Sequence, residues 1–334
     1  MKFMKVRIEK AIELSLKFLM KTGFFLKDSR LITKNLIDAE LSGKKTHGLI
    51  RLPEIRKQVV MGVVSTGNNL KILKNKQTSL FIEANHKPAY IPIYKSLEIA
   101  VKKAKKFGMC VVGIRNSEYG SGYIGSYARQ AALSNLIFIG FNNSPGVLVP
   151  YGTKKALWGT NPITVGIPAK GMPVVLDMAS TIITWGDLII ARQIGKPIEK
   201  GVAIDDKGDV TTDPIKAMGG GLLPIGEHKG SGLAFIIELI AGALTGSRVG
   251  KAVSGGWGTT YILLNPKVFR PLEEFKRDVR KAIEELKSAP KKHGISEIYY
   301  PGEKSQKLRI DNIDEGSIDI DEALFRDLEA IIQL

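Results

Sequence analysis

The chain contains 334 residues, of which 44% are hydrophobic and 25% charged, the profile of a folded globular protein and not of a disordered one. Its length exceeds that of one small domain, so we expect two or three structural units. Lys and Arg outnumber Asp and Glu by 49 to 33, which gives a formal net charge of +16. Because the cations are scattered and not interleaved with aromatic residues, the excess favours attraction of anionic small molecules and nucleotides over binding of nucleic acid.

Cysteine content and hydropathy bear on the compartment. Cys110 is the single cysteine, so no disulfide forms within the chain, and a reducing, cytoplasmic location is expected. The basic N-terminal segment does not predict a signal peptide, because Glu13, Lys17 and Lys21 interrupt its apolar stretches. The most apolar segment, residues 233–244, includes a glutamate and is too short to cross a bilayer, so no membrane partner is expected.

In chain order, hydrophobic periodicity and turn residues predict a helical start followed by alternating strands and helices. The expected helices span residues 6–21, 29–41 behind a cap at Asp28, 52–61, 91–107, 125–134, 230–245, 271–287 and 320–334, and the expected strands span 79–83, 109–114, 136–141 and 261–264. Residues 144–213 read mostly as strands and turns. The pattern predicts an α+β or mixed α/β fold, in which both chain ends (residues 1–75 and about 300–334) form a helical domain beside a central α/β region (76–300) with room for a smaller inserted subdomain.

The sequence Thr46-His47-Gly48-Leu49-Ile50-Arg51 is the first candidate site. A helix that begins near Asp28 and ends before Pro53 would place His47 and Arg51, four residues apart, on one face. An imidazole transfers a proton near neutral pH, and a guanidinium binds a carboxylate through two hydrogen bonds. The pair indicates chemistry on a small α-substituted acid, although simple surface polarity at a helix end also explains it.

The segment Gly120-Ser121-Gly122-Tyr123-Ile124-Gly125 matches the glycine fingerprint of a dinucleotide-binding Rossmann turn. Two features argue against this interpretation. An acidic residue should end the next strand, where this chain has Asn142-Asn143-Ser144, and at least one βα unit precedes a turn that usually follows the first strand of its domain. A glycine-rich turn that lines a site of another design is the better interpretation.

Polar residues beside predicted strands and before the apolar helix form a second set of candidates. Asn143-Ser144-Pro145 and Gly159-Thr160-Asn161-Pro162 suit ligand contacts and turn formation equally. Asp177 ends an apolar strand, where a buried carboxylate needs either a partner in the fold or a ligand. Lys229 lies at the glycine-flanked start of a predicted helix, a position that suits binding of an anion. Tight packing of the glycine-rich loop on the helix would explain the same residues equally well. No metal site is predicted, because the four histidines lie far apart in the sequence.

Together these segments resemble the malate/lactate dehydrogenase family that also holds sulfolactate and ureidoglycolate dehydrogenases, diketogulonate reductase and piperideine-carboxylate reductase. This family is unrelated to the Rossmann malate and lactate dehydrogenases. The matching stretches run in order along most of the chain: Thr46-His47-Gly48 with Arg51-Leu52-Pro53, Arg115-Asn116-Ser117, Asn143-Ser144-Pro145, Gly159-Thr160-Asn161-Pro162, Leu176-Asp177-Met178-Ala179, Thr211-Thr212-Asp213-Pro214, Leu222-Leu223-Pro224, His228-Lys229-Gly230 and Tyr300-Pro301-Gly302-Glu303.

The resemblance implies NAD(P)-dependent reduction of 2-oxo acids to malate-like or lactate-like 2-hydroxy acids, or of related imines to the corresponding amines, run in either direction. It also implies a non-Rossmann cofactor fold and a homodimer whose sites are shared between subunits. Carried over by position, it puts Thr46 and His47 at the substrate and Arg51 on the substrate carboxylate. The implied contacts with NAD or NADP come from Ser144, Asn161, Asp177, Met178, Ala179, His228 and Lys229.

The chain departs from the family pattern at several site positions. Where the family usually has a histidine proposed to transfer the proton, this chain has Tyr119, and a phenol with a reference pKa of about 10 donates a proton in reduction but is a poor base at neutral pH. His47 then becomes a candidate for the main acid/base group. A Gly-Lys pair common in the family is Gly186-Asp187 here, and the glycine-rich segment before the first long helix of the α/β region is Asn85-His86-Lys87-Pro88.

Three functions are compatible with these residues. The first is an NAD(P)-dependent 2-oxo acid reductase in which His47 or Tyr119 transfers the proton and Arg51 orients the carboxylate. The second is a reductase of cyclic imine acids, and the third is a nucleotide-binding homologue that has lost catalysis. The sequence leaves open the substrate side chain and the choice between NAD and NADP.

Overall fold

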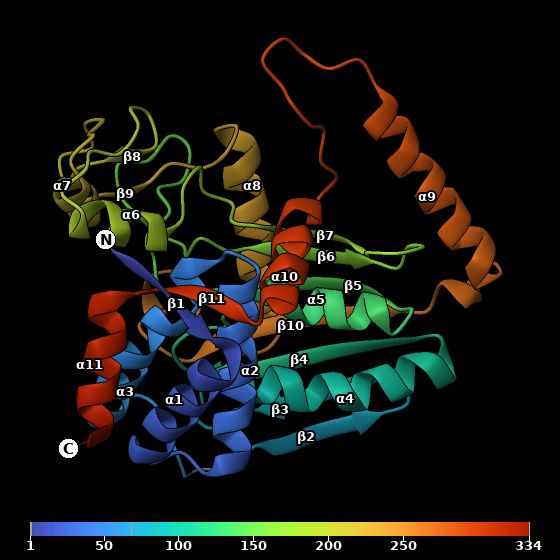
Figure 1. The fold of residues 1–334 in the computed structure, drawn as a ribbon, viewed down its shortest axis with the longest axis horizontal. Helices are drawn as coiled ribbons and strands as arrows, with labels where there is room; N and C mark the ends of the chain where they lie inside the picture. The colour runs from blue at the N-terminus through green and yellow to red at the C-terminus, as the bar shows by residue number, and fades with distance from the viewer. Residues whose placement is uncertain (1, 68, 334) are drawn as a thin grey trace.

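The computed structural model describes residues 2–67 and 69–333 and has a seven-stranded mixed sheet at its centre (Figure 1). Its strands are β2 (Lys71–Lys76), β3 (Ser79–Glu83), β4 (Met109–Ser117), β5 (Ile137–Asn142), β6 (Ile163–Ile167), β7 (Val174–Met178) and β10 (Trp257–Leu264). They lie in the order β2-β3-β4-β10-β5-β6-β7. β3 and β4 pair in parallel, and the other neighbours in this sheet pair antiparallel.

This topology gathers the candidate segments at one edge of the sheet. The pairings make β3, β4, β5 and β7 run in one direction, so their carboxyl ends meet the amino ends of β6 and β10. Tyr119, Ser144, Asn161 and Asp177 therefore all lie at or just beyond this edge. Ligands of open α/β sheets bind at the carboxyl ends of strands, which makes this edge the natural place for a site.

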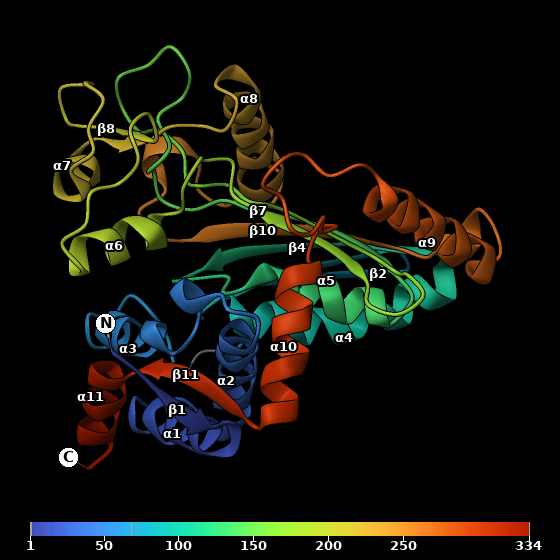
Figure 2. The same ribbon diagram turned by 45° about the horizontal axis from the view of Figure 1, so that its top comes forward.

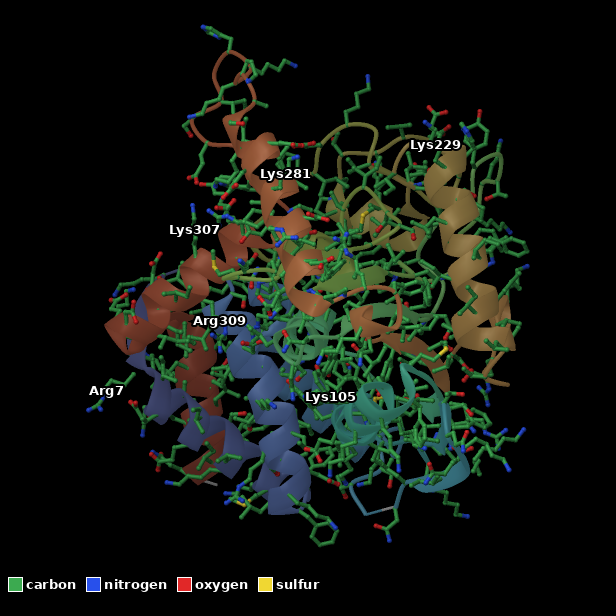
Figure 3. The ribbon with its side chains drawn as sticks, turned by 90° about the vertical axis from the view of Figure 1, so that its right-hand side faces the viewer. Arg7, Lys105, Lys229, Lys281, Lys307 and Arg309 are labelled. Atoms are coloured by element: carbon green, nitrogen blue, oxygen red, sulfur yellow. The ribbon has the colours of Figure 1, made fainter. Side chains whose placement is uncertain are left out.

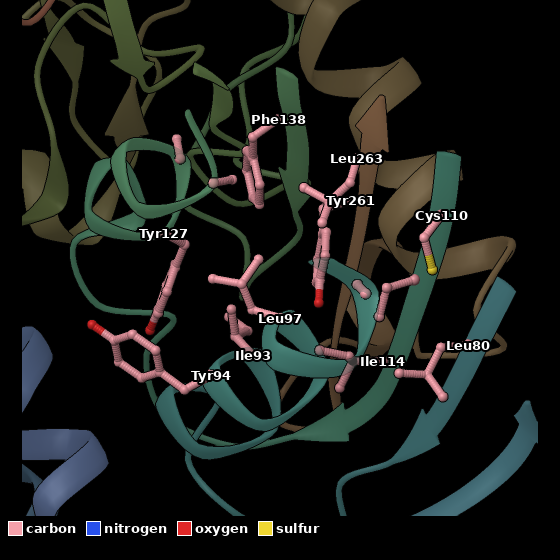
Figure 4. Close-up of a cluster of buried hydrophobic side chains, with 14 of the residues drawn as sticks. Leu80, Ile93, Tyr94, Leu97, Cys110, Ile114, Tyr127, Phe138, Tyr261 and Leu263 are labelled. Atoms are coloured by element: carbon pink, nitrogen blue, oxygen red, sulfur yellow. The ribbon is translucent and has the colours of Figure 1, made fainter. Parts of the chain in front are cut away.

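Helices cover both faces of the sheet. α4 (Tyr90–Phe107) and α5 (Ile124–Leu133) pack on one face, and α8 (His228–Ile237) with its π-helical continuation η3 (Glu238–Ala243) lies on the other. The side chains of β10 alternate accordingly: Tyr261 joins the buried core with Leu97 of α4 (Figure 4), whereas the Thr260 hydroxyl donates to the Ile240 carbonyl of η3. Cys110 is buried in the same core.

A helical region contains both chain ends. It consists of α1 (Ile8–Lys21), α2 (Leu26–Leu41), α3 (Leu52–Val60) and α11 (Glu322–Gln333), with β1 (Phe3–Arg7) paired antiparallel to β11 (Ser317–Asp321). Buried apolar residues of the two ends share one hydrophobic cluster. The fold class is therefore confirmed as mixed α/β with a helical part built from both termini. The division into domains near residues 75 and 300 stays a prediction.

The remaining elements include several that the sequence pattern did not predict. The segment predicted to be mostly strands and turns, residues 144–213, contains β8 (Ala203–Ile204) and also a helix, α6 (Trp185–Gln193). It is followed by the short α7 (Pro214–Gly219) and by β9 (Gly221–Leu222). α9 (Leu272–Ser288) was expected and α10 (Glu303–Glu315) was not. Residue 334 of the expected last helix lies outside the described residues. Among the residues that the structure describes, no helix is both long and apolar enough to cross a membrane.

The predicted cap at Asp28 is wrong. α2 begins earlier, at Leu26, and the Asp28 carboxylate instead binds the ammonium groups of Lys87 at 2.7 Å and Lys95 at 2.9 Å. Both Asp28 and Lys87 are buried, so this pair joins α2 to the start of α4 in the interior. An ion pair between distant parts of the chain leaves no trace in local periodicity.

Candidate active site

The first candidate segment is a pair of short 3-10 turns and not the end of a long helix. α2 ends at Leu41, and the chain then forms η1 (Lys45–His47) and η2 (Leu49–Arg51) before α3. Pro53 stands in the first turn of α3, a position where proline is favoured because its missing N–H would have no helical partner. The expectation that a helix ends before Pro53 is therefore wrong.

A buried carboxylate of α2, Glu40, shapes these turns. One of its oxygens accepts from the Leu49 N–H at 2.8 Å, and the other lies 3.0 Å from the Lys45 ammonium. A Cβ atom at Gly48 would lie only 2.0 Å from a Glu40 oxygen, so glycine is required there. Burial raises the pKa of Glu40, although Lys45 opposes this shift. The sequence analysis missed Glu40, whose only sequence signal is an acidic residue among the apolar positions of a helix.

The turns bring four predicted residues together. The Thr46 hydroxyl lies 2.9 Å from Nδ1 of His47, and Nε of Arg51 donates to the Thr46 carbonyl. The Arg51 guanidinium also reaches Tyr119, whose hydroxyl lies 3.4 Å from Nη1. Thr46, His47, Arg51 and Tyr119 therefore form one polar cluster, although not through the helical spacing that suggested it.

The protonation states of this cluster follow from its environment. Burial, together with the nearby positive charges of Arg51 and Lys44, lowers the pKa of His47 to about 3, so the imidazole is neutral at neutral pH. Burial raises the pKa of Tyr119, against the opposing effect of Arg51, so the phenol keeps its proton. The cluster thus combines a fixed cation, a protonated hydroxyl and a neutral imidazole.

The glycine segment after Tyr119 packs against protein and does not cradle phosphates. A Cβ atom at Gly122 would lie 2.2 Å from the side chains of both Asn35 and Tyr90, and its φ of +68° also favours glycine. The Gly125 N–H, at the start of α5, donates to Asp177 at 2.7 Å. A carboxylate of the chain itself therefore occupies the helix N-terminus that would face pyrophosphate in a Rossmann unit. The fingerprint is a false match, as the sequence analysis favoured.

Asp177 has partners in the fold for both of its oxygens. Besides Gly125, it accepts from the Thr164 hydroxyl at 2.9 Å on the neighbouring strand β6. Burial raises the pKa of this carboxyl, although the two hydrogen bonds oppose the shift. Of the two explanations that the sequence left open, hydrogen bonding within the fold accounts for Asp177. Its contact with a cofactor stays a prediction, as do those of Met178 and Ala179, which follow it at the sheet edge.

Oxygen atoms of Ser144 and Asn161 pack closely against Gly159, and we call this place the oxygen recess, which Gly159 fills. A Cβ atom at Gly159 would lie 2.1 Å from Oγ of Ser144, 2.6 Å from its carbonyl oxygen and 2.9 Å from Oδ1 of Asn161. Oδ1 of Asn161 is buried and has no hydrogen-bond partner within residues 2–67 and 69–333. These distances leave no room for a side chain at residue 159, so only glycine allows the oxygens of Ser144 and Asn161 to pack this closely.

His228 and Lys229 lie at the outer end of α8, where Figure 3 labels Lys229. Both residues are exposed. The same helix reaches the oxygen recess, because Nδ2 of Asn161 donates to the Ala234 carbonyl at 2.9 Å. An exposed ammonium in the first turn of a helix suits an anion.

The segment between β7 and α6 links the recess to the Thr46 cluster. Near one end, the Ser180 hydroxyl donates to the Asn161 carbonyl at 2.7 Å. At the other end, a Cβ atom at Gly186 would lie 2.7 Å from Cβ of Thr46, so α6 approaches η1 closely (Figure 2). Asp187 stands where the family usually has lysine. It forms a capping box with Thr184 and so stabilises the N-terminus of α6.

A separate groove of about 810 Å³ lies between α1, α2, α5 and α10 and contains none of the predicted site residues. Its walls are largely apolar, with Arg129 and Arg309 bound to Asp38 on one side. No group of three or more His, Cys, Asp or Glu residues in the described part of the chain is placed to hold a metal ion.

Comparison with known proteins matches residues 6–329 to the malate/L-lactate dehydrogenase family. The chain is 31% identical to malate/(S)-sulfolactate dehydrogenase of Methanothermus fervidus, over 97% of this chain and 96% of that one. The solved sulfolactate dehydrogenase of Methanocaldococcus jannaschii has a TM-score of 0.89 at 31% identity, covering 99% and 97% of the two chains. A malate dehydrogenase structure from Entamoeba histolytica, at 24% identity over 99% and 97%, shares the fold with a TM-score of 0.94. The chain belongs to the malate/L-lactate dehydrogenase family.

Proposed function

We propose that this protein transfers a hydride between NAD(P)H and a small 2-oxo acid, and equally from the corresponding 2-hydroxy acid to NAD(P)+. Membership of the family already makes it an NAD(P)-dependent oxidoreductase of small hydroxy acids. The observation that carries the finer proposal is the placement of the Arg51 guanidinium 3.4 Å from the Tyr119 hydroxyl. A carboxylate-binding cation then stands beside a proton donor, as the reduction of a 2-oxo acid requires.

At the substrate end, we assign the carboxylate to Arg51. Its Nε is engaged by the Thr46 carbonyl, which fixes the plane of the guanidinium and leaves its terminal nitrogens for a carboxylate. Tyr119, protonated because burial raises its pKa, gives its proton to the carbonyl oxygen as the hydride arrives. The neutral imidazole of His47, held by Thr46, donates or accepts a hydrogen bond at the same oxygen without adding charge.

At the cofactor end, we assign the dinucleotide to the strand ends and to α8. Ser144, Asn161, Asp177, Met178, Ala179, His228 and Lys229 are the residues that would hold it. When bound, the nicotinamide cofactor supplies or accepts the hydride. The exposed ammonium of Lys229 at the start of α8 attracts the phosphates of the cofactor.

The test is oxidation of NADH and NADPH, assayed separately, against a panel of 2-oxo acids and cyclic imine acids. Turnover of an oxo acid that Tyr119→Phe reduces by about two orders of magnitude in kcat, and that Arg51→Ala reduces mainly in kcat/KM, supports the proposal. Faster turnover of cyclic imine acids would replace it with imine reduction. Cofactor binding without turnover of either class would indicate a homologue that has lost catalysis.

We also propose a homodimer, on the resemblance alone, and a cytoplasmic location, on the cysteine content and hydropathy of the sequence. Light scattering coupled to size-exclusion chromatography measures the mass directly, and a value near twice the monomer mass of 36.5 kDa is expected. A monomeric mass with full activity would contradict a site shared between subunits.

A further inference from the structure

The groove between α1, α2, α5 and α10 lies away from the candidate active site. Its lining includes the turn between β6 and β7, residues 171–173, which stands at the edge of the sheet opposite to the carboxyl ends of β5 and β7. Its volume of about 810 Å³ falls within the range of roughly 300–1,000 Å³ that is usual for small-molecule sites. A molecule bound here would therefore occupy a second site, separate from the residues assigned to hydride transfer.

Apolar side chains form most of the wall of this groove. Ile8, Ile12 and Leu16 follow one another at intervals of four residues, so they line one face of α1. Leu133 at the end of α5 and Ile310 of α10 also line the groove, and both are exposed. Accessible apolar side chains gathered around a hollow are characteristic of binding surfaces, so the body of a ligand that fits here is apolar.

One carboxylate in the groove, Asp38 of α2, binds two guanidinium groups. Its oxygens lie 2.5 Å from Nη2 of Arg129 and 2.8 Å from Nε of Arg309, which Figure 3 labels on α10. Burial alone would raise the pKa of Asp38, but the charge of Arg129 and hydrogen bonds from both arginines hold this pKa below its ordinary value, so the carboxylate is ionised. In the described part of the chain, neither guanidinium pairs with another acidic side chain. One positive charge of this cluster therefore has no partner in the protein.

The uncompensated charge is accessible from the groove. The side chain of Arg309 is 31% exposed and that of Arg129 is 12% exposed, and each guanidinium keeps N–H donors that Asp38 does not use. Arg30 and Lys34 of α2 are exposed and also line the groove, so four cations stand against one carboxylate. A guanidinium binds a carboxylate or phosphate through charge-assisted hydrogen bonds, which are stronger beside apolar surface. The head group of a fitting ligand is therefore an anion.

A second copy of the chain is the main alternative occupant, and another face of the molecule suits it better. α8 and η3 lie on the opposite face of the sheet from α5 and expose an uncharged stripe that contains Phe235, Ile236 and Leu239. An apolar stripe of this kind can match its own copy across a two-fold axis. The groove instead presents uncompensated positive charge, and a second copy of a chain with a net charge of +16 is a poor source of the matching anion.

We propose that this groove binds an amphipathic anion, with its acidic head group on Arg129 and Arg309 and its apolar body along α1 and Leu133. The groove contains none of the residues assigned to hydride transfer, so this inference does not depend on the proposed function.

Isothermal titration calorimetry of the purified protein with decanoate tests the proposal. Decan-1-ol has the same apolar chain without the charge, and hexanoate has the same charge on a shorter chain. We expect one decanoate to bind per protein chain, about tenfold more tightly than either of the other two, because the arginines and the apolar wall both contribute. Decanoate that does not saturate the protein, or that binds no more tightly than decan-1-ol or hexanoate, would overturn the proposal.

The variant Arg309→Met identifies the cation. It removes the uncompensated charge but leaves Arg129 paired with Asp38, so the fold should be kept, which the Tm verifies. Decanoate should then bind about tenfold more weakly while decan-1-ol binds as before, and Arg309→Lys should recover most of the affinity. Unchanged decanoate affinity in Arg309→Met would overturn the proposal. The comparison of the three ligands needs no variant, so it decides the matter even if Arg309→Met is unstable.

Two control variants exclude other sites. Arg326→Met removes an exposed arginine of α11 that does not line the groove, and Arg51→Ala removes the cation assigned to the substrate carboxylate. Both should bind decanoate as the unmodified protein does. An equal loss of affinity in Arg326→Met would show a general effect of charge, and a loss in Arg51→Ala would place decanoate in the active site; either result would overturn the proposal.

Light scattering tests the alternative occupant. If the unmodified protein does not bind decanoate and Arg309→Met lowers the measured mass from that of a dimer to that of a monomer, the groove holds a second copy of the chain and the proposal is overturned. An unchanged mass of Arg309→Met, together with its weaker binding of decanoate, is the result that we expect.

Discussion

Replacing Gly48 with alanine tests how Glu40 shapes the Thr46 cluster. The new Cβ would lie 2.0 Å from a Glu40 oxygen, whereas ordinary contact begins at 3.4 Å, so the carboxylate must retreat by 3.4 − 2.0 = 1.4 Å. Such a shift breaks its 2.8 Å hydrogen bond to the Leu49 N–H. Losing a buried hydrogen bond to a charged group costs about 1.5–3 kcal/mol and overpacking about 1–3 kcal/mol, so we expect a total of about 2.5–6 kcal/mol.

Both Tm and kcat/KM should fall in the Gly48→Ala variant. With an unfolding entropy of about 2.1 cal/mol/K per residue, a chain of 334 residues should lose about 4–9 °C in Tm, measured by scanning calorimetry. Because the turns carry His47 and Arg51, a displacement of about 1 Å should also lower kcat/KM by about a hundredfold. Gly67→Ala is the control, since a Cβ there meets nothing within 4 Å and should change neither quantity.

A double-mutant cycle identifies the cause. In a Glu40→Ala background the obstructing side chain is gone, so adding Gly48→Ala should cost far less stability than it does in the unmodified protein. An equal cost in both backgrounds would refute the clash with Glu40, and would point to the backbone conformation of residue 48 itself.

Three further predictions concern charge. Lys87→Met should lower the free energy of unfolding by roughly 3 kcal/mol in urea titration, because it leaves the buried Asp28 with Lys95 as its remaining cation; a loss below about 1 kcal/mol would contradict a buried ion pair. The pKa of His47 in the folded protein, about 3, lies below the ordinary 6.5, so the unfolded chain binds the proton first and the stability falls as the pH drops from 6.5 toward 3. The variant His47→Gln should therefore show a smaller change of Tm over this pH range. An unchanged slope of Tm against pH would mean that His47 is not the group involved. Lys229→Ala should weaken NADPH or NADH binding and reduce its salt dependence in fluorescence titrations, with the exposed Lys281 of α9 as a neutral control.

The sequence predicted the sheet-forming core well because its elements obey local rules. Strand β3 was predicted with its observed bounds and α4 to within one residue, since alternation and helical periodicity report directly on burial. The elements that were missed depend on distant partners. β1 lies in a polar N-terminal segment and becomes a strand because β11, more than 300 residues later, pairs with it from Arg7↔Ser317 to Phe3↔Asp321.

The sequence predicted which residues form the Thr46 cluster, but not the backbone structure that places them together. His47 and Arg51 were expected on one helical face, yet two 3-10 turns place them, and the residue that fixes those turns, Glu40, reaches them from α2. Glu238, a buried carboxylate that accepts from Asn143, Asn161 and the Gly250 N–H, was likewise visible only as an acid in an apolar helix. In both cases the informative observation is a buried carboxylate with specific donors, which becomes visible only when the chain is folded.

The N-termini of α5 and α8 show that a sequence motif can be present without the ligand binding that it usually indicates. Helix α5 begins with the glycine fingerprint, but Asp177 accepts the Gly125 N–H, so the positive end of that helix dipole is already neutralised inside the fold. Helix α8 begins with His228 and Lys229, has no acidic residue in its first turn and exposes both side chains. A phosphate should therefore bind at α8 and not at the fingerprint. Replacing Asp177 with asparagine should lower Tm and should not raise the affinity for NADPH or NADH in fluorescence titrations, whereas a gain in affinity would show that α5 can bind phosphate once the carboxylate is removed.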